Sequence, residues 1–457
     1  MYKINFEQPV HVHFIGIGGI SMSGLAEILL KEDFRVSGSD NKESALTEHL
    51  ASLGASIFYG QKASNIIPGI DVAVYTAAIR EDNEEYREAV RQGLPMLSRA
   101  ELLGQLMTNY RMPVAVAGTH GKTTTTSMLS HILLAADLDP TISVGGILKA
   151  IGGNIRVGSS DVFVTEACEY TNSFLHFFPK IGIILNIDAD HLDFFKDLDD
   201  IRNSFRRFAE LLPEDGTLII NTCIPDLSEI TEGLACKVIT YGDDGDYSAA
   251  DIFHNERGEA SFDLLRHGTL TDRIELSVNG DHNVSNALAA IAAADLLNVP
   301  SGAVKDGLRS FGGTDRRFEL KGTVNGVTVI DDYAHHPTEI TATLTAAANY
   351  PHRKLWCVFQ PHTYTRTKAY LKEFAQSLSL ADEVVLADIY AARETDTLGV
   401  HSEDLQREIQ ALGHECHYFP SFDEIENFLL ENCINGDVLI TMGAGDVVKI
   451  GENLLGS

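Results

Sequence analysis

The sequence alternates between short apolar runs and longer segments in which apolar residues recur at helical spacing. The clearest case covers residues 113–136, where an apolar run ends at Ala117 and gives way to glycines, a lysine and four threonines. Apolar residues then recur between Met128 and Leu133 at the spacing of a buried helical face. This pattern predicts a buried strand, a polar loop and a helix.

The polar loop has the composition of a phosphate-binding loop. Glycines let backbone N–H groups approach a phosphate, Lys122 can neutralise its charge, and the Thr123 hydroxyl can reach Mg²⁺. The motif is a shortened G-x-x-G-K-T, because Val116 stands where the longer form has glycine. An ordinary polar turn is the alternative, but lysine and four threonines begin a helix poorly unless an anion binds there. The predicted ATP contacts of this segment are Gly118, Thr119, His120, Gly121, Lys122, Thr123 and Thr124.

The same pattern of strand, glycine-rich turn and helix opens the chain, and a second strand ends at Asp40. The turn supplies Gly16, Gly18 and Gly19, but Ser21 occupies the third position of G-x-G-x-x-G, so the dinucleotide fingerprint is broken. We interpret the turn as a diphosphate site in which Asp40 suits a ribose or base. Glycines that serve only a tight turn are the alternative.

Two further strand-like segments are followed by Glu166 and His191. The carboxyl ends of parallel strands share one edge of a sheet, so both side chains could meet the phosphate loop. A carboxylate, an imidazole and the Thr123 hydroxyl form a plausible magnesium environment, although histidine is an unusual ligand for so hard a cation. Mn²⁺, or contact through water, is also compatible with His191, and an ordinary loop histidine is the alternative.

The rest of the chain continues in the same α/β manner. Beyond residue 215, the segments TLIIN, KVITYG, ASFDLLRHG and RIELSV predict an antiparallel layer, and Asn283 and Asn286 enter an alanine-rich helix. Units of strand, polar turn and helix return after Arg317. We therefore predict a Rossmann-like N-terminal domain, a central P-loop ATPase-like domain with a parallel sheet plus antiparallel strands, and a Rossmann-like C-terminal domain. Their expected ranges are 1–108, 109–315 and 316–457.

Composition narrows the functional classes. The chain has 457 residues and a net charge of −30, from 35 Lys+Arg against 65 Asp+Glu. Such a charge repels nucleic acid and anionic membrane surfaces, so neither is an expected partner. No run of 18 or more apolar residues occurs and the N-terminus lacks a basic segment before an apolar one, so we expect a cytoplasmic protein. The six cysteines include no C-x-x-C pair, which argues against a zinc site.

Seven strings in order resemble the Mur ligase family of peptidoglycan synthesis: GTHGKTTTT, EACEYTNSF, NIDADHLD, DHNVSNALAA, RRFE, DDYAHHPTE and QPHTYTRT. The resemblance implies that the first domain holds a UDP-sugar, the second ATP and Mg²⁺, and the third an amino acid. The lactyl carboxylate of UDP-N-acetylmuramic acid would attack the γ-phosphate of ATP, and L-alanine would then displace phosphate from the acyl phosphate. These small molecules are the expected partners, and a monomer or weak homodimer is the expected state.

The resemblance also assigns roles to individual residues. Thr123 and Glu166 resemble ligands of one magnesium ion and His191 a contact to a second, while Lys122 and Arg317 would neutralise phosphate charge. Asn283 resembles an adenine contact, Asp332 a nucleotide contact, and His120 a substrate or phosphate contact. The expected UDP-sugar contacts are Gly16, Gly18, Gly19, Ser21, Asp40 and His120, and the expected alanine pocket is Tyr333, His335, His362 and Arg366.

The sequence departs from the family pattern at Thr363, where some relatives have arginine, which leaves Arg366 as the carboxylate clamp. Several family members use a carbamylated lysine after the histidine equivalent to His191, and we do not predict one here. A family member that adds a whole tripeptide is one alternative and would need a wider pocket around Arg366. An NAD-dependent oxidoreductase built on the first turn and Asp40 is a weaker alternative, because its fingerprint is broken.

Overall fold

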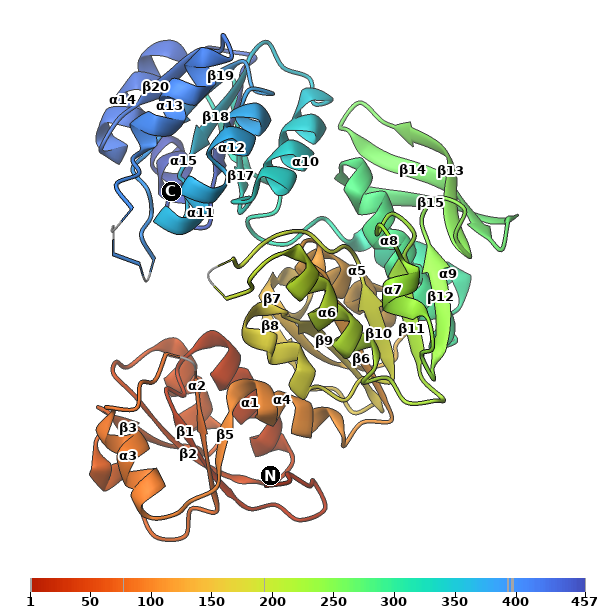
Figure 1. The fold of residues 1–457 in the computed structure, drawn as a ribbon, viewed down its shortest axis with the longest axis vertical. Helices are drawn as coiled ribbons and strands as arrows, with labels where there is room; N and C mark the ends of the chain where they lie inside the picture. The colour runs from red at the N-terminus through yellow and green to blue at the C-terminus, as the bar shows by residue number, and fades with distance from the viewer. Residues whose placement is uncertain (1, 77, 193, 393, 396–397, 457) are drawn as a thin grey trace. The chain divides into compact units, whose positions relative to one another are not determined.

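The computed structural model describes residues 2–76, 78–192, 194–392, 394–395 and 398–456, and the chain folds into two compact units. The first unit comprises Met1–Ala189, Asp197–Ser248 and Leu288–Gly307. The second comprises Asp190–Lys196, Ala249–Ala287 and Leu308–Ser457. Figure 1 labels the helices and strands of both units.

The first unit begins with a five-stranded parallel sheet in the order β3-β2-β1-β4-β5. Strand order reverses at β1, so the turn after β1 lies at the switch point where such sheets bind ligands. The strands are β1 (His11–Ile15), β2 (Arg35–Asp40), β3 (Ser56–Tyr59), β4 (Val72–Tyr75) and β5 (Met96–Ser98). The helices are α1 (Ile20–Lys31), α2 (Ala45–Ser52), the short 3₁₀ helix η1 (Ala63–Asn65), α3 (Glu84–Arg91) and α4 (Arg99–Met107).

The second sheet of this unit runs β12-β11-β10-β6-β9-β7-β8, and all pairs in that series are parallel except β7 with β8. Its strands are β6 (Met112–Ala117), β7 (Thr141–Leu148), β8 (Gly153–Arg156), β9 (Val162–Ala167), β10 (Ile181–Ile184), β11 (Thr217–Asn221) and β12 (Lys237–Tyr241). Its helices are α5 (Lys122–Ala135), the 3₁₀ helices η2 (Lys149–Ile151) and η3 (Tyr170–His176), α6 (Leu198–Ala209) and α7 (Ser228–Thr231). The strand, loop and helix predicted around the phosphate loop are thus confirmed as β6, the 118–121 turn and α5.

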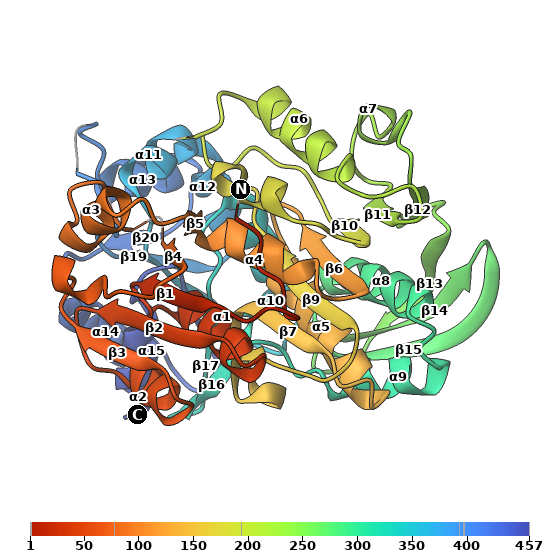
Figure 2. The same ribbon diagram turned by 90° about the horizontal axis from the view of Figure 1, so that it is seen from below.

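The predicted antiparallel layer is wrong for its first two segments. TLIIN forms β11 and KVITY forms β12, and both pair in parallel as a continuation of β10. The prediction holds for the last two, because β14 (Glu259–Arg266) and β15 (Thr269–Asn279) form an antiparallel hairpin after β13 (Tyr247–His254). The hairpin turn at His267 and Gly268 has positive φ angles of 48° and 73°, as a tight two-residue turn requires. Figure 2 shows this hairpin as a curved ribbon.

Two helices follow the hairpin, and then the second unit continues with a six-stranded sheet in the order β16-β17-β21-β18-β19-β20. Only the edge strand β16 is antiparallel. The strands are β16 (Glu319–Val324), β17 (Val327–Asp332), β18 (Leu355–Phe359), β19 (Glu383–Leu386), β20 (Cys416–Tyr418) and β21 (Val438–Met442). Of the two helices after the hairpin, α8 (Asp281–Leu296) and α9 (Ser301–Ser310), residues 288–307 belong to the first unit. The helices of the second unit are α10 (Pro337–Ala348), α11 (Tyr364–Ala369), α12 (Leu371–Leu378), α13 (Ser402–Ala411), α14 (Phe422–Asn432) and α15 (Val448–Leu455).

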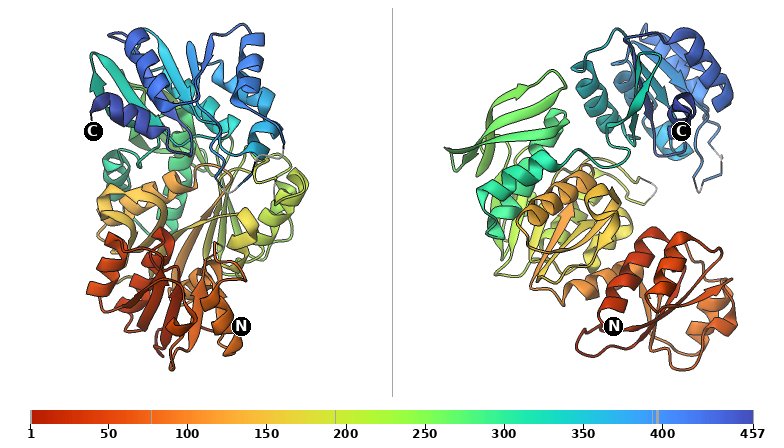
Figure 3. Two further views of the ribbon diagram at one scale, coloured as in Figure 1. Left: turned by 90° about the vertical axis from the view of Figure 1, so that its left-hand side faces the viewer. Right: turned by 180° about the vertical axis from the view of Figure 1, so that it is seen from behind.

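Helices cover both faces of this last sheet (Figure 3). Along β18, Leu355, Cys357 and Phe359 pack with α10, α12 and α13, whereas Trp356 and Val358 pack with α14 and α15. Burial on both faces explains why these strands read as continuous apolar runs. The α/β fold class is confirmed, with a parallel N-terminal sheet and mixed sheets after it. Within the described ranges, no helix has both the length and the apolar character needed to cross a membrane.

Candidate active site

The loop between β6 and α5 has the backbone of an anion site. Gly118 and Gly121 adopt φ angles of 147° and 81°, which side chains other than glycine rarely accept. A Cβ at Gly118 would lie 2.9 Å from the Cβ of Leu185. No described side chain caps the N-terminus of α5, and its first turn contains no acidic residue. The backbone N–H groups and the positive end of the helix dipole therefore suit a bound phosphate.

Lys122, the first residue of α5, is held by an acidic partner that the sequence did not single out. Its Nζ lies 2.9 Å from Oε2 of Glu169 and donates to the carbonyl oxygens of Gly118 and Thr119. Glu169 itself is only 2% exposed. Burial opposes the charge of Lys122, but Glu169 outweighs that effect and the pKa of Lys122 is raised. The ammonium group is therefore charged and already oriented. Glu169 lies in the EACEYTNSF string, and that motif is the sequence feature from which it could have been identified as a site residue.

Residues 186–188, which follow β10, form hydrogen bonds with the phosphate loop. The His120 N–H donates to Oδ1 of Asn186 (2.8 Å), and the Asn186 amide donates back to the His120 carbonyl (3.1 Å). Nε2 of His120 lies 3.1 Å from Oδ2 of Asp188, and the Asp188 N–H donates to the Thr119 hydroxyl (2.9 Å). These bonds fix the position of His120 within the phosphate loop.

Thr123 and Glu166 flank a pair of glycines in β7. The Gly145 N–H donates to Oε1 of Glu166 (2.5 Å), and a Cβ at Gly145 would lie 2.8 Å from Oε2. A Cβ at Gly146 would lie 3.3 Å from Cγ2 of Thr123. A hydroxyl and a carboxylate around this bare backbone fit Mg²⁺, which is usually bound by few protein oxygens together with phosphate oxygens and water. Among the described residues, no three His, Cys, Asp or Glu side chains form a metal-binding group.

His191, the third predicted metal contact, belongs to the second unit, whereas Thr123 and Glu166 belong to the first. Its φ angle is 54°, and its N–H donates to Oδ1 of Asp190 (2.7 Å). The geometry thus brings Thr123 and Glu166 together within the first unit.

Asp190 also accepts a hydrogen bond from Arg366, the residue predicted to bind the substrate carboxylate. Nη2 of Arg366 donates to Oδ1 of Asp190 (2.8 Å), and both side chains are only 10% exposed. Burial opposes ionisation of Asp190, but Arg366 and then His191 outweigh it and hold the pKa of Asp190 below its usual range. Nη1 of Arg366 lies 3.2 Å from Nδ1 of His362, whose ring stacks on Tyr390 at 5.7 Å. Arg366 is therefore preorganised. Sequence reasoning missed Asp190 although it lies in the NIDADHLD string, and it missed Tyr390, which lies in none of the quoted strings.

Two histidines of the expected alanine pocket are neutral at pH 7. The His335 ring meets Tyr333 and His362 edge-on, with centroid distances of 5.4 and 5.5 Å. Burial lowers the pKa of His335 and that of His362 to about 4 in each case. The structure thus brings all four predicted pocket residues into one cluster.

The residues expected to meet the nucleotide lie beside this cluster. Arg317 packs over the Tyr333 ring at 5.3 Å, and its Nη1 lies 3.6 Å from Oε1 of Glu339. Asp332 accepts hydrogen bonds from the N–H groups of Phe318 (2.8 Å) and Ala334 (2.7 Å). Burial raises the pKa of Asp332 to about 6, against the opposing effect of Arg317.

Asn283 lies in the first turn of α8, where its amide donates to the Asn279 carbonyl (2.7 Å). Its Oδ1 accepts a hydrogen bond from Asn286 (3.0 Å). Both amides are thus used in local hydrogen bonds. A base edge would have to share these groups.

The N-terminal turn is closed by the strand that follows it. The N–H groups of Gly16 and Ile17 each donate to the Ser39 carbonyl (2.9 Å), and the Gly18 N–H donates to Oδ2 of Asp40 (2.9 Å). Gly19 lies immediately before α1, and Ser21 is in its first turn. The five predicted UDP-sugar contacts of this region therefore surround one turn at the switch point of the sheet.

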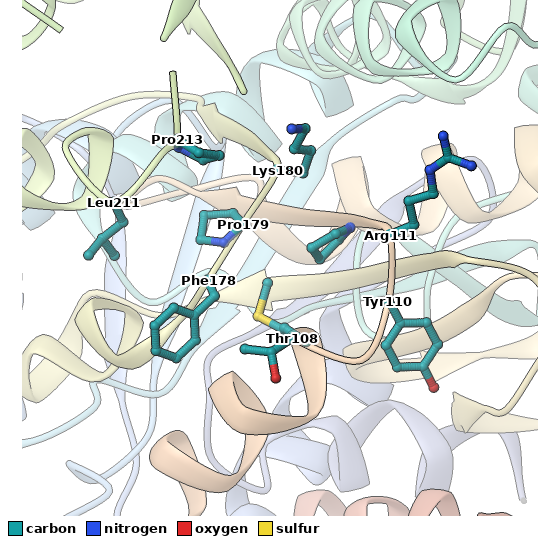
Figure 4. A pocket seen from close by; sticks show the side chains of 10 residues that line it. Thr108, Tyr110, Arg111, Phe178, Pro179, Lys180, Leu211 and Pro213 are labelled. Carbon is teal, nitrogen blue, oxygen red and sulfur yellow. The ribbon is translucent and has the colours of Figure 1, made fainter. Parts of the chain in front are cut away.

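A pocket of about 290 Å³ lies elsewhere, at the amino ends of β6 and β10 (Figure 4). The phosphate loop follows the opposite, carboxyl end of β6. The pocket is lined by Met107, Thr108, Tyr110, Arg111, Pro113, Phe178, Pro179, Lys180, Leu211 and Pro213. None of the predicted site residues lines it.

The order of these features matches one family throughout. Residues 11–111 match the model described as Mur ligase family, catalytic domain, and residues 116–294 match the Mur ligase middle domain. Residues 316–445 match the model described as Mur ligase, glutamate ligase domain. The chain belongs to the Mur ligase family.

Particular relatives are similar over the whole length. The chain is 62% identical to the UDP-N-acetylmuramate–L-alanine ligase of Lachnospira eligens and 61% identical to that of Agathobacter rectalis, with complete coverage of both sequences in each case. Its fold matches the UDP-N-acetylmuramate-alanine ligase of Thermotoga maritima with a TM-score of 0.80, at 30% identity and 98% coverage of both chains. It matches a murein peptide ligase of Psychrobacter arcticus with a TM-score of 0.68, at 27% identity and the same coverage.

Proposed function

We propose that this protein joins L-alanine to the lactyl carboxylate of UDP-N-acetylmuramic acid at the expense of ATP. The observation that carries the proposal is the 62% identity, over the full length of both chains, to a ligase named for these two substrates. The phosphate loop with its oriented Lys122 and the cluster around Arg366 supply the two polar sites that such a reaction needs.

In the first step, the lactyl carboxylate attacks the γ-phosphate of ATP to give an acyl phosphate and ADP. Lys122 and the N–H groups at the start of α5 bind and orient the phosphates and offset their negative charge. Mg²⁺, held by Thr123 and Glu166, would supply further charge neutralisation on the phosphate oxygens. Lys122 already has its charge and direction, so little reorganisation is needed when the phosphates bind.

In the second step, the amine of L-alanine attacks the acyl phosphate and phosphate leaves. Arg366 holds the carboxylate of the amino acid through its guanidinium, sharing it with Asp190. His335 and His362 remain neutral near pH 7, so they can accept hydrogen bonds from the amine without adding positive charge. Arg317, beside Tyr333, is proposed to neutralise phosphate charge, with Asp332 and Asn283 as nucleotide contacts.

The proposed ligase activity also implies a domain organisation, a second metal contact, a cellular location and an oligomeric state. The domains are 1–108 for the UDP-sugar, 109–315 for ATP and 316–457 for the amino acid. His191 contacts a second metal ion, for which Mn²⁺ can replace Mg²⁺. The protein acts in the cytoplasm as a monomer or weak homodimer, on small molecules only.

The test measures phosphate release from ATP with UDP-N-acetylmuramic acid and either L-alanine or the tripeptide as the third substrate. We expect release that depends on L-alanine and on the UDP-sugar together. Release with the tripeptide alone would instead favour the activity named for the murein peptide ligase, whose fold is also similar. No release with either acceptor would reject the proposal.

A further inference from the structure

A chain of polar side chains is buried under the UDP-sugar turn and takes no part in the reaction described above. His11 and His13 lie on β1, Ser37 and Ser39 on β2, and Glu85 in the first turn of α3. None of the five is more than 4% exposed. Such a group is costly to bury unless every member is hydrogen-bonded.

Four contacts run in series from the Gly69 carbonyl to Glu85, and a fifth joins Glu85 to Ser39. Nδ1 of His11 lies 3.1 Å from the Gly69 carbonyl, and its Nε2 lies 2.8 Å from the Ser37 hydroxyl. The same hydroxyl lies 2.8 Å from Nδ1 of His13, whose Nε2 lies 2.7 Å from Oε1 of Glu85. Ser39 donates its own hydrogen to Oε2 of Glu85 (2.5 Å).

Counting hydrogens shows that this series holds one extra proton. The four contacts require four hydrogens, whereas Ser37 and two neutral imidazoles supply three and an ionised Glu85 supplies none. The extra proton is therefore held within the series from His11 to Glu85, every member of which is buried.

Glu85 is coupled to the substrate turn through Ser39. The Ser39 side chain is bound by Glu85, and its carbonyl accepts the N–H groups of Gly16 and Ile17. The next residue, Asp40, accepts the Gly18 N–H. Movement of Ser39 would therefore displace the backbone that forms the glycine-rich turn.

We propose that Glu85 is a positioning residue for the UDP-sugar turn and that it acts by retaining this buried proton, an inference that rests on the proposed UDP-sugar specificity. When the proton leaves at higher pH, one buried contact loses its hydrogen and the support of Ser39 weakens. Affinity for the UDP-sugar then falls as pH rises. The charged groups outside the series that act on it are Arg35 and Asp71.

Glu85→Gln offers a sharp test, because the glutamine amide can donate to Nε2 of His13 while its oxygen accepts from Ser39. All four contacts are then satisfied with two neutral imidazoles and no extra proton. The matched control is His49→Gln, which removes a half-exposed histidine of α2 that pairs with Glu27 outside the series.

The experiment measures UDP-N-acetylmuramic acid affinity by calorimetry from about pH 6.5 to about pH 8.5, above the ordinary histidine pKa. We expect the affinity of the native protein, relative to Glu85→Gln, to fall roughly tenfold over this range, the size of one lost buried hydrogen bond. Ionisation of the ligand cancels in this ratio. His49→Gln should follow the native profile. Parallel profiles for the native protein and Glu85→Gln would overturn the proposal.

A second readout needs no ligand and separates this proposal from the proposed function. The Tm of the native protein, relative to that of Glu85→Gln, should fall as pH rises, because the folded state alone retains the proton. If no variant binds the UDP-sugar but the Tm difference still changes with pH, the proposed specificity is rejected and the buried proton is supported. A Tm difference that does not change with pH would overturn the buried proton.

Discussion

Glu169 determines the state of the reactive lysine. It is almost fully buried, and its carboxylate balances the Lys122 ammonium at 2.9 Å. Removing one partner of a buried pair leaves the other charge without compensation, which is strongly destabilising. Without Glu169, Lys122 would lose both its charge stabilisation and its direction toward the phosphates.

We therefore expect Glu169→Gln to lower kcat/KM for ATP by roughly 10- to 100-fold, as expected for a misplaced charged group. Glu169→Asp keeps the charge on a shorter stem and should retain more activity. Steady-state kinetics with each substrate varied in turn would check this, with Lys122→Ala as the inactive reference. Equal kinetics for the Gln and Asp variants would show that the charge at residue 169 does not matter.

His335 makes the second unit sensitive to acid. Burial lowers its pKa from 6.5 to about 4, so the unfolded chain binds a proton that the folded chain resists. The resulting stability is complete above about pH 6.5 and is lost as pH falls toward 4. For this mostly buried side chain, the loss amounts to at most about 3 kcal/mol.

His335→Asn should accordingly flatten the fall in Tm between about pH 6.5 and about pH 4.5, the range in which the two states differ in bound protons. The exposed His414 gives the control, since His414→Asn should leave the native slope unchanged. Thermal unfolding across this range measures both slopes. A slope for His335→Asn as steep as the native one would contradict the assignment.

At the scale of single elements, α11 begins at a strained residue. Thr363 precedes it with φ 66° and ψ 147°, a region that residues other than glycine rarely occupy. The Thr363 N–H donates to the Tyr390 carbonyl (2.9 Å), and its hydroxyl accepts a long bond from the Arg366 N–H (3.4 Å) and lies 3.5 Å from the Thr365 hydroxyl. Thr363 thus anchors the start of the helix that carries Arg366, in a strained backbone conformation.

Thr363→Gly should raise Tm, because relief of the backbone strain, of order 1 kcal/mol, exceeds the few tenths lost with the cap. Thr363→Val is the matched control: it keeps a branched side chain and the strain but removes the cap acceptor, so it should lower Tm. Differential scanning calorimetry would measure both. A Gly variant that melts below the native protein would mean that the turn is not strained.

Patterns that belong to a single element were readable from the sequence. The phosphate loop and the strand that ends at Asp40 follow from local periodicity, and both are present. The parallel direction of β11 was missed although all five of its residues are buried, because a short apolar run does not reveal its partner. Position along the chain also gave no sign that Glu169 or Asp190 would meet a basic side chain.

The polar residues of β1 and β2 show a second limit. HVHF and VSGSD alternate between polar and apolar positions, which ordinarily indicates a strand with one solvated face. In the structure, both faces are buried, and His11, Ser37, His13 and Glu85 form one hydrogen-bonded series. Alternation indicates that one face of the strand is polar, but it does not show whether that face meets solvent or other buried polar groups.

At the scale of the whole molecule, the net charge of −30 opposes the binding of anionic substrates. Local cations such as Lys122 and Arg366 are already paired with Glu169 and Asp190, so they offset little of the long-range field. Salt screens such a field strongly once the Debye length falls to about 10 Å, near 0.1 M. Screening should therefore help an anion approach but leave a zwitterion unaffected.

We expect KM for ATP and for UDP-N-acetylmuramic acid to fall roughly two- to fivefold between about 0.01 M and about 0.1 M monovalent salt, through faster association. KM for L-alanine should change little, which makes the amino acid an internal control within the same assay. A zwitterionic solute at equal osmolarity controls for effects other than screening. A rise in both anion KM values with salt would mean that local cations dominate the field that the substrates meet, despite their acidic partners.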